Sequence, residues 1–418
     1  MRSWASTYIP PLDSKFAIPQ LHLQNTASRS LETLPIQDTY RMYVCGITPY
    51  DATHLGHANT YLAFDLVNRF LRARGSKVSY VQNITDIDDP LLERAIRDGV
   101  DWKDLATSQI ELFRGDMVDL HILPPDHYIG AVEAIPLVLT AIERLSAADA
   151  TYLVDSDIYF DVHTDKNFGT RSHLSKEKSI EIFAQRGGDP NREGKRDPLD
   201  ALLWMQQRPN EPGWDSDIGK GRPGWHIECC AIALHYLDPN PESSYSIDIQ
   251  GGGSDLIFPH HEISAAQSSV MNGKEFSHLY VHAGMIGLNG EKMSKSKGNL
   301  IFVSKLIQDG NDPMAIRLAL LSHHYQEDFM WTEDVLIEAT NLLNKIRIAL
   351  SREEVPPTDE VINAIVKALS ENLDTPTAIS HLNKWSDLAL SHSQSDAKKM
   401  GNPGELSRAI DSFLGIAL

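Results

Sequence analysis

Near the start of the chain, a buried strand, an amphipathic helix and a second strand follow one another. Residues 41–47 are apolar enough for a buried strand, and residues 77–84 return to strand-like composition. Between them, residues 58–74 repeat Leu, Phe and Val at three- and four-residue spacing before Gly75, a typical helix stop. This order predicts a parallel crossover unit. We therefore expect an α/β fold with a Rossmann-like parallel sheet.

The strand and helix signals are interrupted by a mixed segment and then resume. Strand or helix patterns return at 225–237, 246–250 and 279–286, and from about residue 331 the pattern is helical, with candidate helices at 335–351, 358–371, 375–391 and 405–414. We predict five regions: a first catalytic half (1–150), an insertion (151–224), a second catalytic half (225–300), a stem (301–340) and an all-α helical bundle (341–418).

Charge and cysteine content narrow the class of protein. The 38 basic and 57 acidic residues give a net charge of −19, which disfavours nucleic-acid and membrane partners. The three cysteines cannot build an extracellular disulfide framework and fit a reducing compartment. The first residues lack the pattern of a secretory signal, and the sequence contains no apolar run long enough to span a membrane. We expect a cytoplasmic monomer that acts on small molecules.

The stretch HLGH at His54–His57 follows the first predicted strand and opens the first predicted helix. A helix N-terminus favours anions, and glycine lets a nucleotide approach the backbone closely. His54 and His57 could hydrogen-bond a triphosphate and stabilise charge at its α-phosphorus. Alone, however, a turn with two histidines is more often structural than catalytic.

A second candidate site is KMSKS at Lys292–Ser296, after an Asn-Gly pair that is typical of a tight hairpin. Lys292 and Lys295 could neutralise a leaving pyrophosphate as flexible point charges. The alternative is a solvated Lys/Ser loop, which is the better explanation for an isolated pentapeptide. The two motifs together, at opposite ends of a split α/β domain, favour the catalytic interpretation.

Three residues have the side chains of a zinc site. Cys45 lies at the end of the first strand, Cys229 in a predicted helix, and His260 near the start of another. Catalytic zinc uses about three protein ligands and keeps one position open. A substrate thiol could fill that position, and zinc prefers sulfur to a hydroxyl. Buried thiols and an interior imidazole are an equally good alternative from these residues alone, and Cys230 points away on the helix, as a packing residue would.

The two signatures resemble those of class I aminoacyl-tRNA synthetases, which make acyl adenylates from ATP. Further stretches are similar to the cysteinyl-tRNA synthetase family: CGIT at 45–48, NITDIDD at 83–89, GRPGWHIEC at 221–229 and GGGSD at 251–255. The resemblance covers most of residues 40–300. It implies one Zn²⁺ held by Cys45, Cys229 and His260, and ATP used with Mg²⁺. It also implies that the cysteinyl-adenylate site contains Gly46, Ile47, Thr48, Thr60, Asn83, Ile84, Thr85, Trp225, Gly253, Ser254, Asp255 and Ile286.

Within that family, the chain most resembles the cysteine ligases of mycothiol synthesis. The stretches RGGDP at 186–190 and GKRDPLD at 194–200 are similar to a signature of that branch, which usually begins with Glu where this chain has Gln185. Ser264 stands where the synthetases commonly have a further glutamate ligand, and Glu262 would point away from His260 on a helix. The segment after the KMSKS loop is short, which leaves little room for an anticodon-reading module. Its helical part is also acidic, whereas a tRNA-binding tail would ordinarily carry clustered Lys and Arg.

The resemblance implies a two-step ligation. L-Cysteine is first activated with ATP as cysteinyl adenylate. The amine of 1-O-(2-amino-2-deoxy-α-D-glucopyranosyl)-1D-myo-inositol (glucosaminyl-inositol) then displaces AMP, and either solvent or a carboxylate such as Asp86 or Asp189 takes its proton. One alternative is a cysteinyl-tRNA synthetase, with tRNA as the acceptor. Another is a catalytically silent paralogue that binds nucleotide or cysteine, although the intact histidines and lysines argue against it.

Overall fold

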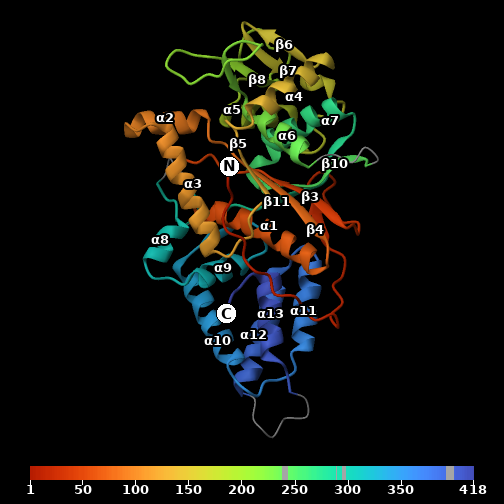
Figure 1. Cartoon of the computed structure of the whole chain (residues 1–418), viewed down its shortest axis with the longest axis vertical. Coiled ribbons are helices and arrows are strands. Elements are labelled where there is room, and N and C mark those ends of the chain that lie inside the picture. The colour runs from red at the N-terminus through yellow and green to blue at the C-terminus, as the bar shows by residue number, and fades with distance from the viewer. Residues whose placement is uncertain (238–242, 289, 294–297, 392–399) are drawn as a thin grey trace.

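A five-stranded parallel sheet lies at the centre of the molecule (Figure 1), in a computed structural model that describes residues 1–237, 243–288, 290–293, 298–391 and 400–418. The strand order is β11-β10-β3-β4-β5, and every neighbouring pair is parallel. The strands are β3 (Thr39–Val44), β4 (Lys77–Ile84), β5 (His127–Gly130), β10 (Tyr245–Gly253) and β11 (Glu275–Ala283). The predicted Rossmann-like sheet is confirmed, with strands from two distant parts of the sequence.

The helix α1 (Leu55–Ala73) packs its apolar residues against this sheet. It begins at His54, whose side chain accepts hydrogen bonds from the Gly56 and His57 backbone amides as an N-cap. The strand before it ends at Val44, earlier than the predicted residue 47. The reason is close packing, because a Cβ on Gly46 would lie 1.7 Å from the Asn83 carbonyl oxygen. Beyond Val44, the Gly46 amide donates to Asn83 Oδ1 at 2.7 Å, and the Ile47 carbonyl accepts from the Thr85 amide at 3.0 Å.

The insertion forms a separate antiparallel sheet at one end of the molecule (Figure 1). Its order is β6-β7-β8-β9, where β6 is Thr151–Val154, β7 Asp157–Phe160, β8 Ala201–Gln206 and β9 Gly221–Pro223. The chain enters it through α4 (Ile135–Ala147), adds α5 (Lys176–Gln185) and returns to the core through α6 (Trp225–Tyr236). The core and the insertion share the apolar cluster that includes Cys45, Cys229 and Trp204.

The segment after the central sheet joins the core to a helical bundle at the opposite end (Figure 1). The small strands β12 (Ile286–Leu288) and β13 (Glu291–Lys292) pair antiparallel, which confirms the predicted hairpin, and β14 (Phe329–Trp331) pairs parallel with β12. The helices are α8 (Val303–Gln308), α9 (Pro313–Leu321), α10 (Glu333–Leu350), α11 (Asp359–Ser370), α12 (Thr375–Ser391) and α13 (Pro403–Leu414). The predicted C-terminal helices are confirmed to within a few residues.

The remaining elements flank the sheet: β1 (His22–Asn25) and β2 (Ser30–Thr33) form a small hairpin beside β11, and α2 (Asp89–Asp98) and α3 (Trp102–Asp119) lie between β4 and β5 in sequence. The short helix η2 (Ser254–Leu256) and the π turn η3 (Ile257–His261) lead into α7 (Glu262–Asn272). Among the described residues, none of the helices combines the length and the apolar character that crossing a bilayer requires.

Candidate active site

A cavity of about 480 Å³ opens where the strands β3 and β10 end. This edge of a parallel sheet is where α/β folds bind ligands, because the crossovers on the two sides diverge there. Its wall combines strand-tip residues with the start of α1 and with residues near the KMSKS loop: Cys45, Gly46, Ile47, Thr48, Tyr50, His54, Gly56, His57, Thr60, Tyr61, Trp225, Gly253, Asp255, Leu256, Met285, Met293 and Leu300.

The two histidines of the HLGH turn are brought together in this cavity. The rings of His54 and His57 stack with centroids 3.6 Å apart. His54 also caps the helix, since its Nδ1 accepts from the Gly56 and His57 amides at 3.1 and 3.4 Å. The N-terminal end of α1 therefore faces the cavity with both imidazoles, a suitable place for phosphate charge.

The flank of the KMSKS loop is bonded directly to this turn. The Leu55 amide donates to the Ile301 carbonyl at 2.9 Å, and the Val303 amide donates to the Thr53 carbonyl at 3.0 Å. The segment that follows the KMSKS loop, around Ile301 and Val303, is therefore joined to the HLGH turn through the backbone. Lys292 belongs to β13, whereas Lys295 lies outside the described residues.

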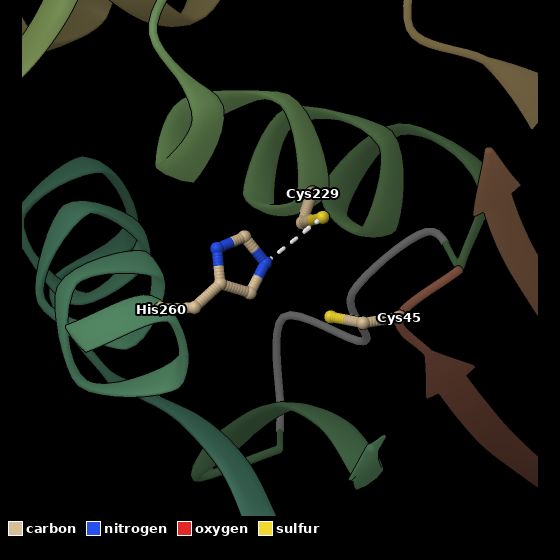
Figure 2. A group of neighbouring side chains, drawn as sticks. All are labelled: Cys45, Cys229 and His260. Carbon is tan, nitrogen blue, oxygen red and sulfur yellow. Dashed lines mark hydrogen bonds between the residues drawn. The ribbon is translucent and has the colours of Figure 1, made fainter. Parts of the chain in front are cut away.

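Cys45, Cys229 and His260 meet at the end of β3 (Figure 2). They come from three separate elements, and their sulfur and nitrogen atoms all lie within 4.8 Å of one another. His260 Nε2 is 3.2 Å from Cys229 Sγ. All three side chains are buried, and two thiols with one imidazole are soft and borderline donors of the kind that zinc prefers. The group could hold a metal ion.

The two thiols influence each other's protonation. Burial raises the pKa of the Cys45 thiol, and the neighbouring Cys229 raises it further. Burial also opposes ionisation of Cys229, but hydrogen bonds with Cys45, His260 and Tyr43 hold the pKa of Cys229 well below its usual value. The protein alone therefore favours one thiolate, and a bound cation would favour the second.

Four further side chains extend from this group in two chains of contacts that the sequence analysis did not find. His261 Nε2 lies 3.2 Å from Cys45 Sγ, its Nδ1 lies 2.7 Å from His282, and His282 is 2.7 Å from the Thr26 hydroxyl. On the other side, His226 Nδ1 lies 3.1 Å from His260 Nδ1. Such partners fix the orientation of ligand side chains. The adjacent pair at 260–261 was the only local signal for them.

Glu262 and Ser264 have their own partners away from the sulfur atoms. The Glu262 carboxylate accepts from the Gly169 and Ser172 amides at 2.9 and 2.7 Å and pairs with Arg171 at 3.1 Å. Ser264 Oγ donates to the His226 carbonyl at 2.9 Å. Glu262 therefore ties the insertion to α7, as expected for a side chain that points away from His260.

The predicted adenylate residues fall into two groups. Those that line the cavity are Gly46, Ile47, Thr48, Thr60, Trp225, Gly253 and Asp255, and those outside its lining are Asn83, Ile84, Thr85, Ser254 and Ile286. Asn83 acts from behind, because its Oδ1 accepts from the Gly46 amide at 2.7 Å and from the Tyr43 hydroxyl at 3.0 Å. It thereby fixes the backbone that follows Cys45.

Trp225 lines the cavity beside the group formed by Cys45, Cys229 and His260, called the metal-type group below. Its ring stacks on His260, with centroids 4.4 Å apart. Tyr50, Tyr61, Leu256 and Met285 are lining residues that lie outside the motifs. Their contribution is mainly shape, which depends on tertiary packing and has no local spacing.

The fold and the strand-end cavity define a catalytic domain of the class I aminoacyl-tRNA synthetases. The family described as tRNA synthetases class I (C) catalytic domain matches residues 33–341. Among solved structures, Mycobacterium tuberculosis methionyl-tRNA synthetase in complex with methionyl-adenylate has a TM-score of 0.62, covering 91% of this chain and 90% of that one at 18% identity. The LeuRS-tRNA-LeuAMS complex of Agrobacterium radiobacter K84 agnB2 has a TM-score of 0.63 at 11% identity, covering 92% and 84%.

Closer relatives narrow the family. Proteins called L-cysteine:1D-myo-inositol 2-amino-2-deoxy-alpha-D-glucopyranoside ligase match over 100% of both chains, at 52% identity in Thermomonospora curvata and 51% in Streptomyces griseus subsp. griseus and Nocardia farcinica. The chain belongs to this ligase family within the class I synthetases.

Proposed function

We propose that this chain joins L-cysteine to the amine of glucosaminyl-inositol at the expense of ATP, releasing AMP and pyrophosphate, in mycothiol synthesis. The observation that carries the proposal is the opening of the buried Cys45/Cys229/His260 group, through Cys45, into the same cavity as His54 and His57. A group suited to a thiol thus lies beside a cradle suited to phosphate. The names of its full-length relatives support the same reaction.

In the first step, a carboxylate oxygen of cysteine bonds to the α-phosphorus of ATP as the bond to pyrophosphate breaks. His54, His57 and the end of α1 bind the phosphates and stabilise the developing charge. Lys292 and Lys295 neutralise the pyrophosphate, and magnesium accompanies the nucleotide. Asp255, which lines the cavity, takes a ribose hydroxyl or the cysteine ammonium. Catalysis in this step is mostly positioning and electrostatics.

Cys45, Cys229 and His260 would hold one zinc ion. When bound, zinc lowers the pKa of a coordinated thiol and prefers sulfur to a hydroxyl oxygen, which would select cysteine over serine. His226 and His261 orient the group, since each contacts one of its members. Trp225 stacks on His260 and limits the room for the cysteine side chain.

In the second step, the amine nitrogen of the sugar bonds to the activated carbonyl carbon. The carbon–oxygen bond to phosphate breaks, its electron pair leaves with AMP, and the nitrogen loses a proton to solvent. The acceptor separates this reaction from that of a cysteinyl-tRNA synthetase. The acidic excess of the helical bundle supports a small-molecule acceptor over tRNA.

The proposed reaction suggests where the protein works and in which oligomeric state. The three cysteines are all free thiols, as expected in the reducing cytoplasm where ATP is available. We propose a monomer as the working unit.

The test offers the purified protein ATP and cysteine with either glucosaminyl-inositol or tRNA. We expect AMP release and amide formation with the amino sugar. AMP release with tRNA alone would assign the protein to the synthetases, and absence of cysteine-dependent ATP–pyrophosphate exchange would indicate a silent paralogue. Metal analysis of the active protein provides an independent readout, with about one zinc per chain expected.

A further inference from the structure

A second chamber of about 710 Å³ adjoins the first cavity. The two share Thr48, Tyr50, Trp225, Asp255 and Leu256 in their walls, so that they form one continuous cleft. Under the proposed function, the first chamber binds ATP and the thiol of the substrate cysteine. An acceptor has to reach the activated carboxyl group from an adjoining space, and the second chamber is continuous with the cavity where that group forms.

The walls of the second chamber come from opposite sides of the fold. One side is the start of α2, with Asp88 and Asp89, and the other is the insertion, with Tyr159, Asp189 and Arg192. The chamber therefore combines carboxylates, a guanidinium group and aromatic rings. Carboxylates and arginine are good partners for vicinal hydroxyls, and a carboxylate also attracts an ammonium group. These groups suit a polyhydroxylated amine rather than an apolar ligand.

The RGGDP stretch is built into this chamber. Gly187 has φ = 85°, and a Cβ on Gly188 would lie 2.5 Å from the Phe183 ring, so both positions favour glycine. Arg186 donates to the backbone carbonyls of Asp255 and Phe258. The stretch is therefore fastened to the loop that carries Asp255, at the boundary between the two chambers.

Asp189 is held in place by three neighbouring side chains, one of which is Arg192, 3.9 Å from its Oδ2. Lys195 Nζ lies 2.9 Å from its Oδ1, and the Tyr159 hydroxyl donates to its Oδ2. The Lys195 side chain is only 1% exposed, whereas that of Asp189 is 39% exposed. The pair thus presents a carboxylate of fixed orientation to the chamber.

Asp88 occupies the opposite wall. It caps α2, with its Oδ1 accepting from the Asp89 amide at 2.9 Å. Burial is the main reason that the pKa of Asp88 rises to about 6. The Asp89 amide, Arg222 and His260 oppose this rise in pKa, and the Asp89 carboxylate adds to it. The carboxylate therefore remains mostly ionised at neutral pH and is partly shielded from water.

We propose that the second chamber is the acceptor subsite, in which Asp88 binds the amine and the Asp189/Tyr159/Arg192 wall binds the hydroxyls of the attached polyol. This inference rests on the proposed ligation and adds the residues that recognise its second substrate. The RGGDP stretch then supplies acceptor recognition, and the motif residues of the first chamber supply cysteine activation.

The test compares Asp88→Asn and Asp189→Asn with two matched controls. Asp98→Asn changes an exposed carboxylate at the far end of α2, and Asp215→Asn changes an exposed carboxylate of the insertion that does not line the chamber. Two readouts are measured on the full chain: cysteine-dependent ATP–pyrophosphate exchange, which needs no amine, and the KM for glucosaminyl-inositol in amide formation. The melting temperature reports on folding.

We expect each chamber variant to raise the KM for the amine by roughly 10-fold or more, the usual loss for a charged hydrogen bond, while exchange stays within about 2-fold of the wild type. The controls should leave both readouts unchanged. An unaltered KM in both variants, or an equal loss of exchange and ligation, would overturn the subsite. If the wild type supports exchange but makes no amide with the amino sugar, the proposed function itself fails, and this inference fails with it.

Discussion

Two clusters of buried polar side chains differ in how their hydrogen-bonding groups are used. In the strand-end site, Cys45, Cys229 and His260 direct their donor atoms toward one another. In the second cluster, Asp65 and Arg69 on α1 meet Arg317 on α9, and all three side chains are 0% exposed.

The partners of the second cluster are all supplied by the protein. Asp65 pairs with both guanidinium groups and also accepts from the Leu123 amide at 2.9 Å. Arg69 and Arg317 donate their remaining bonds to backbone carbonyls, including those of Asp411 and Leu414 at the end of α13. This cluster ties the bundle to the catalytic domain. The cluster of Asp65, Arg69 and Arg317 finds its hydrogen-bond partners within the protein, and we interpret it as structural. The converging side chains at the strand ends are instead suited to binding a ligand.

The largest change is expected in the free energy of unfolding, when the cluster of Asp65, Arg69 and Arg317 is disrupted. Asp65→Asn leaves two buried guanidinium groups without their carboxylate, so we expect a loss of about 3–5 kcal/mol in the free energy of unfolding. Urea denaturation at pH 7 measures it. Exchange activity at 25 °C should persist in the fraction that remains folded. A variant as stable as the wild type would show that the cluster is not a structural tie.

The same cluster predicts acid sensitivity. Although burial opposes ionisation of Asp65, the charges of Arg69 and Arg317 lower its pKa below the ordinary value of 3.8. A lowered pKa in the folded state stabilises the protein above the unfolded value, and this contribution is lost as the pH falls through the folded pKa. The wild type should therefore lose its stability advantage over Asp65→Asn below about pH 4.

The next largest change is expected in the zinc affinity of the group formed by Cys45, Cys229 and His260. Cys229→Ser replaces a soft ligand with a hard one. Mutating a residue that only contacts a metal ligand typically costs up to about 100-fold in metal affinity. Because Cys229 is itself a proposed ligand, we expect its loss to lower zinc affinity by at least about 100-fold. Metal analysis after gel filtration checks this, together with cysteine-dependent exchange. Cys230→Ser is the matched control, because Cys230 is equally buried on α6 but lies outside the group. Full zinc in Cys229→Ser would refute the proposed coordination.

Asp116 on α3 is a further buried carboxylate, and it belongs to neither of the two clusters. Burial is the main reason that the pKa of Asp116 rises to about 7; the nearby Thr53 opposes the rise, and Asp119 adds to it. Because the folded state holds the proton more tightly, stability should fall as the pH rises from about 4 to about 7. Asp116→Asn removes this dependence and should gain on the order of 1–3 kcal/mol relative to the wild type at pH 8. Identical pH profiles in urea denaturation would contradict the assignment.

The comparison also shows what could be predicted from sequence. The local periodicity predicted α1, β4 and the bundle helices, because each places its apolar residues within a few positions. The convergence of Cys45, Cys229 and His260 followed from a family resemblance, not from spacing. The contact of Arg317 with Asp65 and the chain from His261 through His282 to Thr26 were not predicted. Such contacts join residues far apart in sequence and produce no local pattern.

The smallest effect tests whether the metal-type group is complete with three ligands. Ser264 lies on α7 one turn after His260, where related synthetases commonly have a further ligand, but its hydroxyl donates to the His226 carbonyl. Ser264→Ala should therefore cost only about 0.5–1.5 kcal/mol of stability, the usual value of one buried hydrogen bond, and leave zinc content unchanged. Thermal denaturation and metal analysis are measured together. A loss of zinc comparable with that of Cys229→Ser would mean that the hydroxyl serves the metal, and the group would then need its fourth protein ligand before any thiol substrate arrives.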